Sequence, residues 1–106
     1  MKTLLLSLAL MMTTIISAQT SILGEWVTID DESGEQKSVV NIYKADNGMY
    51  YGQIVTLFED PDALCTACKD ADYNQPIVGL TIIRDMQLVE GELRGGKVLD
   101  PENGKL

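Results

Sequence analysis

Beyond residue 20, the chain is a series of short apolar runs separated by polar turn residues. The runs are rich in Val, Ile, Thr and Tyr, which favour strands over helices. They occupy residues 22–29, 38–44, 49–58, 77–83, 87–93 and 97–100. Apolar residues do not recur at spacings of three and four over any long window, as they would in an amphipathic helix. The pattern predicts an all-β fold, an antiparallel meander of hairpins.

Several of the predicted strands are apolar on both faces. In residues 49–58, one face would carry Met49, Tyr51, Val55 and Leu57, and the other Tyr50, Ile54 and Phe58. A sheet with one face in water alternates more cleanly between apolar and polar residues. Gly52, in the middle of this run, is typical of a bend or bulge that curves the sheet. We therefore expect a closed or nearly closed barrel, or a sheet covered on both sides.

Turn signals divide the runs. Asn47-Gly48 strongly favours a hairpin, because both residue types tolerate positive φ. The sequence of residues 100–104 (DPENG) predicts another turn, but only Lys105 and Leu106 follow it in the sequence. A turn without a returning strand leaves an unpaired sheet edge. We therefore expect that C-terminal strands are missing and that the barrel is incomplete; the alternative is a short frayed tail.

The N-terminus has the order of regions found in secretory signal peptides. Lys2 precedes a mostly apolar run over residues 4–16, and Ala18 offers a small residue for cleavage. A membrane anchor is the alternative, but the run is shorter than the roughly 20 residues that span a bilayer. We predict a signal peptide at residues 1–18, cleavage after Ala18, and one exported domain at residues 19–106, secreted or periplasmic, with no membrane span.

The charge of the chain excludes one class of partner. Lys and Arg number 8, Asp and Glu number 16, and the net charge is −8. Nucleic-acid binding requires clustered cations that displace counterions from phosphates, so no nucleic-acid partner is expected. The chain has no histidine. It therefore lacks the commonest general base and the commonest zinc ligand.

Cys65 and Cys68 (C-T-A-C) lie in a charged loop, residues 60–76 (DPDALCTACKDADYNQP). Two cysteines of an exported protein usually pair, and a bridge over so short a loop would contribute about 2 kcal/mol on the chain-entropy model. A redox dithiol is the alternative. Its thiols would need a lowered pKa, whereas the surrounding aspartates raise it. We predict a local disulfide.

A metal site is a further alternative at this loop. Two thiolates without histidine would need carboxylate ligands or a second chain to complete a zinc site. Asp70, Asp72 and Asn74 resemble the start of a calcium loop, but Gln75 and Thr81 occupy the positions that require Gly and Glu. Dimer-bridging zinc and adventitious calcium remain as alternatives. We expect no metal and no cofactor.

The sequence offers no constellation typical of an enzyme. Asp30, Asp31, Glu32 and Glu35 could form a pair of acid–base carboxylates, but they share one polar turn, where charges are usually solvated. No serine stands in a nucleophile elbow, and no glycine-rich stretch follows a strand to bind phosphate. We expect no catalytic residues and no enzymatic activity.

Three stretches resemble a known family. They are residues 22–44 (ILGEWVTIDDESGEQKSVVNIYK), the C-T-A-C motif followed by QPIVGL at residues 75–80, and GGKVLDPENGK at residues 95–105. Together they are similar to the secreted bacterial family called domain of unknown function 2147, over residues 22–105. The resemblance implies a small exported barrel of the lipocalin-like (calycin) architecture and no established activity. Members of that family continue past this turn with further strands, including an end that contains tryptophan and arginine.

Gly24-Glu25-Trp26 also resembles the G-x-W motif of lipocalins, in which the tryptophan closes one end of the barrel. Fold analogy, although a weak warrant, then predicts a binding protein for a small, partly apolar ligand. Candidate ligand-binding residues are Trp26, Tyr43, Tyr50 and Tyr51, because aromatic walls with polar tips suit such pockets. Alternatively, they are ordinary core or surface residues. A second hypothesis is a cell-envelope interaction module that presents residues 60–76 to an unknown protein partner.

Overall fold

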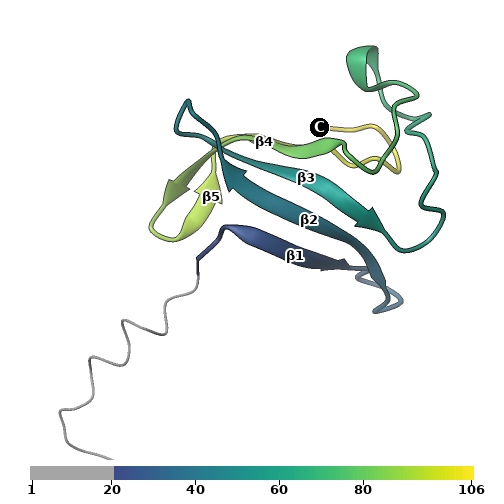
Figure 1. Cartoon of the computed structure of the whole chain (residues 1–106), viewed down its shortest axis with the longest axis horizontal. Helices are drawn as coiled ribbons and strands as arrows, with labels where there is room; N and C mark the ends of the chain where they lie inside the picture. Colours follow the sequence, from purple (N-terminus) through teal and green to yellow (C-terminus); the bar gives the residue numbers. More distant parts are fainter. Residues whose placement is uncertain (1–20) are drawn as a thin grey trace, which may run out of the picture.

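The computed structural model of this protein describes residues 21–106, in which six strands form one antiparallel sheet (Figure 1). The strands are β1 (Gly24–Ile29), β2 (Gln36–Lys44), β3 (Tyr50–Leu57), β4 (Thr81–Val89), β5 (Glu92–Arg94) and β6 (Lys97–Val98). Strands β1 to β4 follow one another in sheet order as in sequence, and β5 and β6 both pair with β4. A short 3-10 turn, η2 (Asp70–Asp72), lies in the long loop after β3. The predicted all-β antiparallel meander is confirmed.

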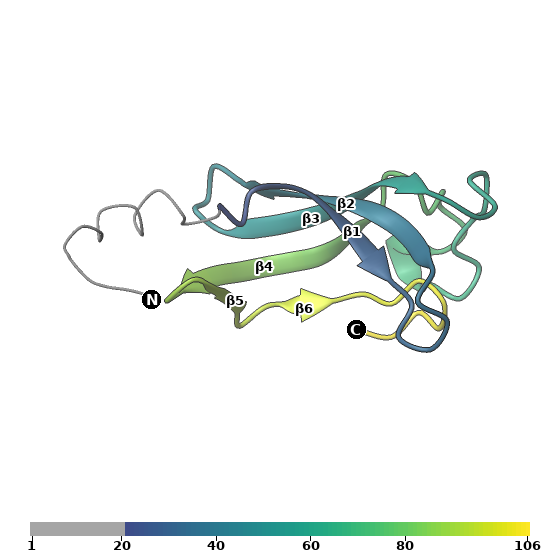
Figure 2. The same ribbon diagram turned by 90° about the horizontal axis from the view of Figure 1, so that it is seen from below.

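The sheet is curled into a half-barrel. Seen from below, β1, β2 and β3 form one side and β4, β5 and β6 bend beneath them (Figure 2). Val40, Ile42 and Ile54 are buried on the concave face, together with partly buried residues from the opposite side such as Ile82 and Ile83. Within residues 21–106, β1 pairs only with β2, so these strands do not close into a ring. That further strands follow in a complete version stays a prediction.

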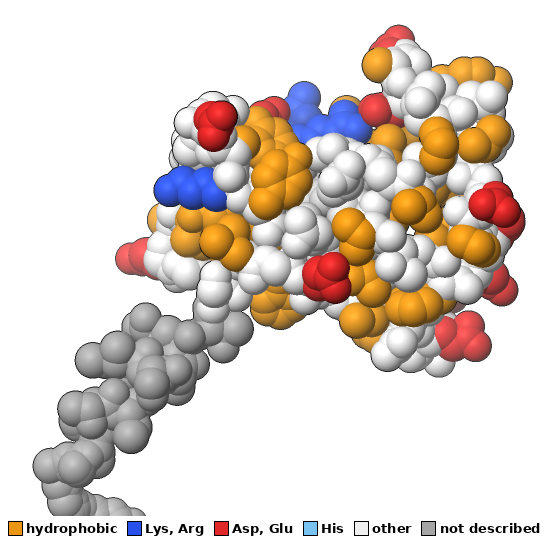
Figure 3. All heavy atoms as spheres, in the orientation of Figure 1, with side chains coloured by type: hydrophobic (Ala, Val, Ile, Leu, Met, Phe, Trp, Pro, Cys, Tyr) orange, Lys and Arg blue, Asp and Glu red, His pale blue; other side chains and the backbone are white. Residues whose placement is uncertain are grey.

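Hydrophobic side chains remain on the surface of the half-barrel. Trp26, Val27, Ile29 and Phe58 keep between 43% and 52% of their surface exposed, and Figure 3 shows hydrophobic patches spread over one face among acidic side chains. Val27 pairs with Val39 on the convex face and Trp26 with Val40 on the concave face, so apolar side chains of the described residues stay exposed on both faces.

A bulge in β3 corrects the predicted faces of that strand. Val39 pairs with Thr56 and Val40 pairs with Ile54, so Val55 is an extra residue in the ladder. Leu57 then pairs with Ser38. Directly paired residues share a face and an extra residue changes the alternation, so Leu57 lies on the concave face with Ile54. Its predicted place on the other face, with Val55, is wrong.

The strand boundaries after residue 76 also differ from the prediction. Residues 77–80 form a turn rather than a strand: the N–H of Leu80 donates to the carbonyl of Ile77 at 3.0 Å, and Gly79 has a φ of 103°. In place of the predicted runs 77–83 and 87–93, β4 extends over Thr81–Val89, and the end of the second run turns back into β5 (Glu92–Arg94). Asp85, with a φ of 55°, sits in the middle of β4 and lets the strand bend without ending.

The hairpin predicted at Asn47-Gly48 is confirmed. Gly48 has a φ of 85°, and the N–H of Ala45 donates to the carbonyl of Met49 at 2.9 Å. The predicted signal peptide and its cleavage point after Ala18 lie outside the described residues. In the part of the chain that the structure describes, no helix has the length and apolar character needed to cross a bilayer.

Candidate functional site

The long loop after β3 folds around the two cysteines. The structure brings Cys65 and Cys68 to disulfide distance, with their Cα atoms 5.4 Å apart. Both are buried and form a second small core with Leu80 and Leu99. Partly buried Ile77 and Ile82 contact both this core and the one on the concave face. The disulfide is therefore part of the packing that joins the loop to the half-barrel.

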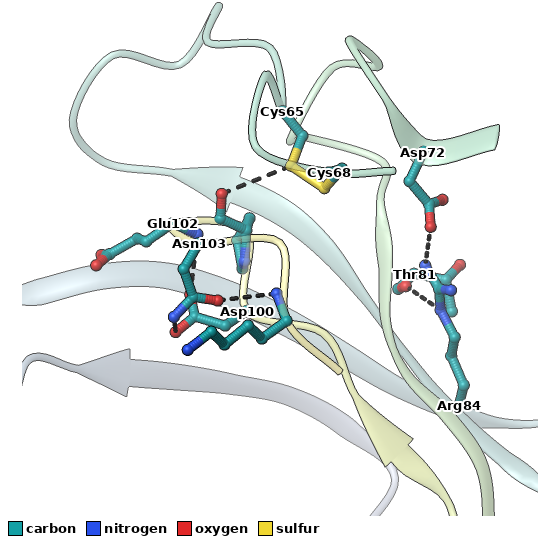
Figure 4. Close-up of a disulfide and its surroundings, with 10 residues drawn as sticks. Cys65, Cys68, Asp72, Thr81, Arg84, Asp100, Glu102 and Asn103 are labelled. Atoms are coloured by element: carbon teal, nitrogen blue, oxygen red, sulfur yellow. Dashed lines mark hydrogen bonds and ion pairs between the residues drawn. A yellow bond between two sulfur atoms is a disulfide. The ribbon is translucent and has the colours of Figure 1, made fainter. Parts of the chain in front are cut away.

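The C-terminal turn, residues 100–105, rests on this disulfide loop (Figure 4). The Sγ atom of Cys65 lies 3.5 Å from the carbonyl oxygen of Pro101. Gly104 is buried and has a φ of 74°, and a Cβ at this position would collide with the carbonyl oxygen of Ala67. Only glycine permits such a close approach of two backbones. The position of the turn is thus set by the loop beneath it.

Hydrogen bonds within the C-terminal turn hold its shape. The N–H of Gly104 donates to the carbonyl of Asp100 at 2.7 Å, and the N–H of Asp100 donates to the carbonyl of Lys105 at 2.8 Å. The Asp100 carboxylate accepts from the N–H of Glu102 at 2.9 Å. Asn103 similarly accepts from the N–H of Lys105 at 2.8 Å. The turn therefore presents Pro101 and Glu102 in a defined place.

A pocket of about 270 Å³ lies between the concave face of the sheet and this turn. We call it the concave pocket. Its lining residues are Thr28, Lys37, Ser38, Ile54, Leu57, Ile77, Ile82, Asp100, Pro101 and Glu102. The first strands supply one wall, the residues around Ile77 and Ile82 supply another, and the C-terminal turn supplies the third. The bulge at Val55 matters here, because it turns Leu57 into the pocket.

Two hydroxyl groups mark the apolar wall of the concave pocket. Ser38 is 6% exposed, and its Oγ lies 2.7 Å from the Oγ1 of Thr28, its direct partner on β1. Burial of a hydroxyl is unfavourable unless a hydrogen bond compensates for it, and this pair compensates internally. Each hydroxyl oxygen carries two lone pairs, so the pair can still accept a hydrogen bond from a ligand.

An ion pair lies at the mouth of the concave pocket. The Nζ of Lys37 bonds to Glu102 and lies 3.8 Å from Asp30. The hydrogen bond to Glu102 raises the pKa of Lys37. Backbone N–H groups of Ser33 and Glu32 lower the pKa of Asp30, with Lys37 contributing less. These side chains are well exposed, so the ion pair adds little to stability; it instead sets the charge at the mouth.

Comparison with known proteins places the chain in a family. The sequence model described as "Uncharacterized protein conserved in bacteria (DUF2147)" matches residues 24–106. The chain belongs to this family. The match spans all six strands, the disulfide loop and the C-terminal turn. No curated protein and no solved structure matches the chain.

In this DUF2147 protein, two of the four predicted ligand-binding residues lie on the convex face. Tyr43 pairs directly with Tyr51, and their rings stack at 5.9 Å between centroids. The hydroxyl of Tyr51 donates to Asp85 at 2.7 Å and accepts from Asn47 at 2.9 Å. These contacts fasten the β2–β3 hairpin to β4, and neither ring lines the concave pocket.

The other two predicted residues lie on the concave face but outside the pocket. Trp26 pairs with Val40, remains 43% exposed, and donates from Nε1 to the carbonyl of Ile22 at 2.8 Å. Tyr50 packs against the concave core. The role of all four aromatic residues in binding stays a prediction.

Sequence reasoning did not identify the residues that line the concave pocket. Ser38 and Leu57 looked like ordinary strand positions, because the bulge that pairs them has no glycine or proline to mark it. Pro101 was recognised only as part of a turn. Gly104 is the one sequence signal for this turn. The turn approaches the disulfide loop so closely that position 104 must have no side chain.

Asp72, in the disulfide loop of residues 60–76, has a structural partner. Asp72 forms an ion pair with Arg84 at 3.0 Å, and the Nε of Arg84 donates to the carbonyl of Thr81 at 2.8 Å (Figure 4). Among residues 21–106, no group of three or more Cys, Asp or Glu side chains is placed to hold a metal ion. The expectations that this protein binds no metal and is not an enzyme stay predictions.

Proposed function

We propose that this DUF2147 protein is exported and binds a small, partly apolar ligand in the concave pocket of a lipocalin-like half-barrel. The observation that carries the proposal is the pocket itself, an apolar hollow with one buried hydroxyl pair in its wall. Small-molecule sites are typically concave and mainly apolar, with a few polar groups that orient the ligand. The concave pocket has each of these properties.

The construction of the pocket supports the proposal. Ile54, at 2% exposure, provides a wall that belongs to the hydrophobic core and so does not move independently. The opposite wall, Pro101 and Glu102, is fixed by the disulfide loop. A preformed pocket favours binding, because little conformational entropy is lost in ordering its walls around the ligand.

A pair of substitutions on neighbouring positions of β3 tests the proposal. Leu57→Glu places a charge in the concave pocket, whereas Val55→Glu places the same charge at the bulge, where the side chain is 36% exposed and does not line the pocket. The measurement is native mass spectrometry of protein purified from its host, followed by titration with 1-hexanol monitored by amide NMR shifts. For the wild type and Val55→Glu, we expect a co-purifying small molecule in the mass spectrum and amide shifts on addition of 1-hexanol. For Leu57→Glu, we expect neither. Absence of binding to the wild type would refute the proposal.

Export has its own test. The support is the order of charged, apolar and small residues before Gln19. We expect the protein recovered outside the cytoplasm to begin at Gln19 and to contain no free thiol at Cys65 or Cys68. Intact mass before and after alkylation checks both points. A mature protein that retains Lys2 would contradict cleavage.

A second candidate is an interaction module that uses the loop of residues 60–76. Figure 1 shows this loop projecting beyond the strands. Tyr73 and Leu64, both in the loop, are 56% and 43% exposed. Crosslinking in the cell with a photoreactive residue at position 73, compared with one at position 43 on the convex face, tests this role. A defined adduct at position 73 alone favours it.

A further inference from the structure

The concave pocket adjoins a second hollow of about 680 Å³ at its mouth. The two share Lys37, Leu57, Ile77 and Glu102 as lining residues. We call the second one the acidic hollow, because four carboxylates line it: Asp30, Glu35, Glu59 and Glu102. A ligand seated in the concave pocket would therefore extend its outer end into a space bordered by carboxylates.

The charge of the acidic hollow is negative even with its lysine included. Lys37 is the one cation among its lining residues, and it already contacts Glu102 and Asp30. Hydrogen bonds from backbone N–H groups lower the pKa of Asp30, so this carboxylate stays ionised at neutral pH. Glu35 and Glu59 add two further negative charges. Clefts lined by charges of one sign concentrate ligands of the opposite sign.

We propose that the ligand of the concave pocket is a cationic amphiphile. Its apolar body lies between Ile54, Leu57 and Ile82, and its ammonium or guanidinium head lies in the acidic hollow. This inference rests on the proposed function. The acidic hollow alone would not identify a ligand. The adjoining concave pocket is the second observation, because its apolar lining offers a place for the body of the ligand directly beside the carboxylates.

An anionic head is disfavoured by the same contacts. A carboxylate or phosphate would need Lys37 as its partner, but Glu102 and Asp30 already occupy the ammonium group. It would also face the charges of Glu35 and Glu59. Repulsion between like charges at close range weakens binding. Attraction between opposite charges is instead strengthened by the low dielectric constant of the apolar wall beside them.

Three probes with the same apolar chain test the inference. They are n-hexylamine, 1-hexanol and heptanoate, each titrated at low salt and followed by amide NMR shifts of Ser38 and Leu57. We expect hexylamine to bind about three to ten times more tightly than hexanol, a modest gain because the carboxylates are exposed, and heptanoate to bind most weakly. High salt should reduce the difference, because it screens exposed charges.

Matched charge variants separate a local effect from the overall charge of the protein. Glu35→Gln with Glu59→Gln removes two carboxylates from the acidic hollow. Glu25→Gln with Glu90→Gln removes two elsewhere, on exposed positions that line neither hollow. We expect the preference for hexylamine to disappear in the first double variant and to remain in the second. An equal loss in both would overturn the inference, because it would show non-specific attraction.

The outcomes distinguish this inference from the proposed function. If hexanol binds as tightly as hexylamine, the concave pocket is a ligand site without a charge preference, and the inference fails while the proposed function stands. If heptanoate binds most tightly, Lys37 is the head-group partner and the inference fails. If no probe shifts Ser38 or Leu57, both proposals fail.

Discussion

Replacement of Gly104 by alanine tests whether the disulfide loop sets the position of the C-terminal turn. Gly104 has a φ of 74°, and a Cβ there would collide with the backbone carbonyl of Ala67. Gly48→Ala is the matched control. Gly48 has a φ of 85°, but a Cβ at that position would have no atom within 4 Å. The two substitutions thus share the cost of a left-handed backbone and differ in the collision.

The expected magnitudes follow from these two terms. A left-handed conformation costs a residue with a Cβ about 1–2 kcal/mol, which is the whole effect expected for Gly48→Ala. Relief of a collision with backbone requires the turn or the loop to shift, at a further cost of about 1–3 kcal/mol. We therefore expect Gly104→Ala to lower the free energy of unfolding by about 1–3 kcal/mol more than Gly48→Ala.

Urea denaturation followed by circular dichroism measures both changes, provided that the slopes of the transitions agree. Because Pro101 and Glu102 line the concave pocket, Gly104→Ala should also weaken the binding of 1-hexanol, whereas Gly48→Ala should not. Equal destabilisation by the two substitutions would refute the reasoning, since the turn would then not rest on the loop.

Three further predictions concern the core, the disulfide and pH. Ile54→Ala should destabilise the fold by about 2–4 kcal/mol, as expected for a buried large-to-small change, and the neighbouring Val55→Ala by less than about 1 kcal/mol; urea denaturation of both variants decides whether the concave face is the core. Cys65→Ser with Cys68→Ser should cost about 2 kcal/mol in loop entropy, plus the loss of buried contacts, and a variant as stable as the oxidised wild type would contradict the packing of the loop. The Asp30 carboxylate has a lowered pKa in the fold, so its stabilising effect is present above the unfolded value of 3.8 and is lost as the pH falls through the folded value. The stability difference between the wild type and Asp30→Ala should accordingly shrink below about pH 4, and a difference that grows there would show the sign to be wrong.

Much of the fold was readable from the sequence because it depends on local chemistry. Runs of β-branched residues indicated the strands, and Asn47-Gly48 indicated the hairpin between β2 and β3, since tolerance of positive φ is a property of those residue types. The pairing of Cys65 with Cys68 was also predicted, because the two cysteines of an exported protein usually pair, and the structure brings them to disulfide distance. Gly52 in the middle of a strand indicated that the sheet curves. In the structure, a Cβ at this position would lie 2.9–3.0 Å from the side chains of Ile83 and Val40.

The concave pocket, by contrast, depends on tertiary structure. The bulge at Val55 arises from the register between β2 and β3, and it moves Leu57 to the concave face without any sequence signal. The carboxylates of Asp30 and Glu102 are 72 positions apart and meet at Lys37 only because the C-terminal turn rests on the disulfide loop. Periodicity along one strand reports which residues are apolar, but the pairing of strands and the contact of distant turns decide which side chains share a wall. The sequence by itself determined the class of fold, the Asn47-Gly48 turn and the cysteine pair, whereas the turn at residues 77–80, the pocket and its acidic mouth appear only in the tertiary structure.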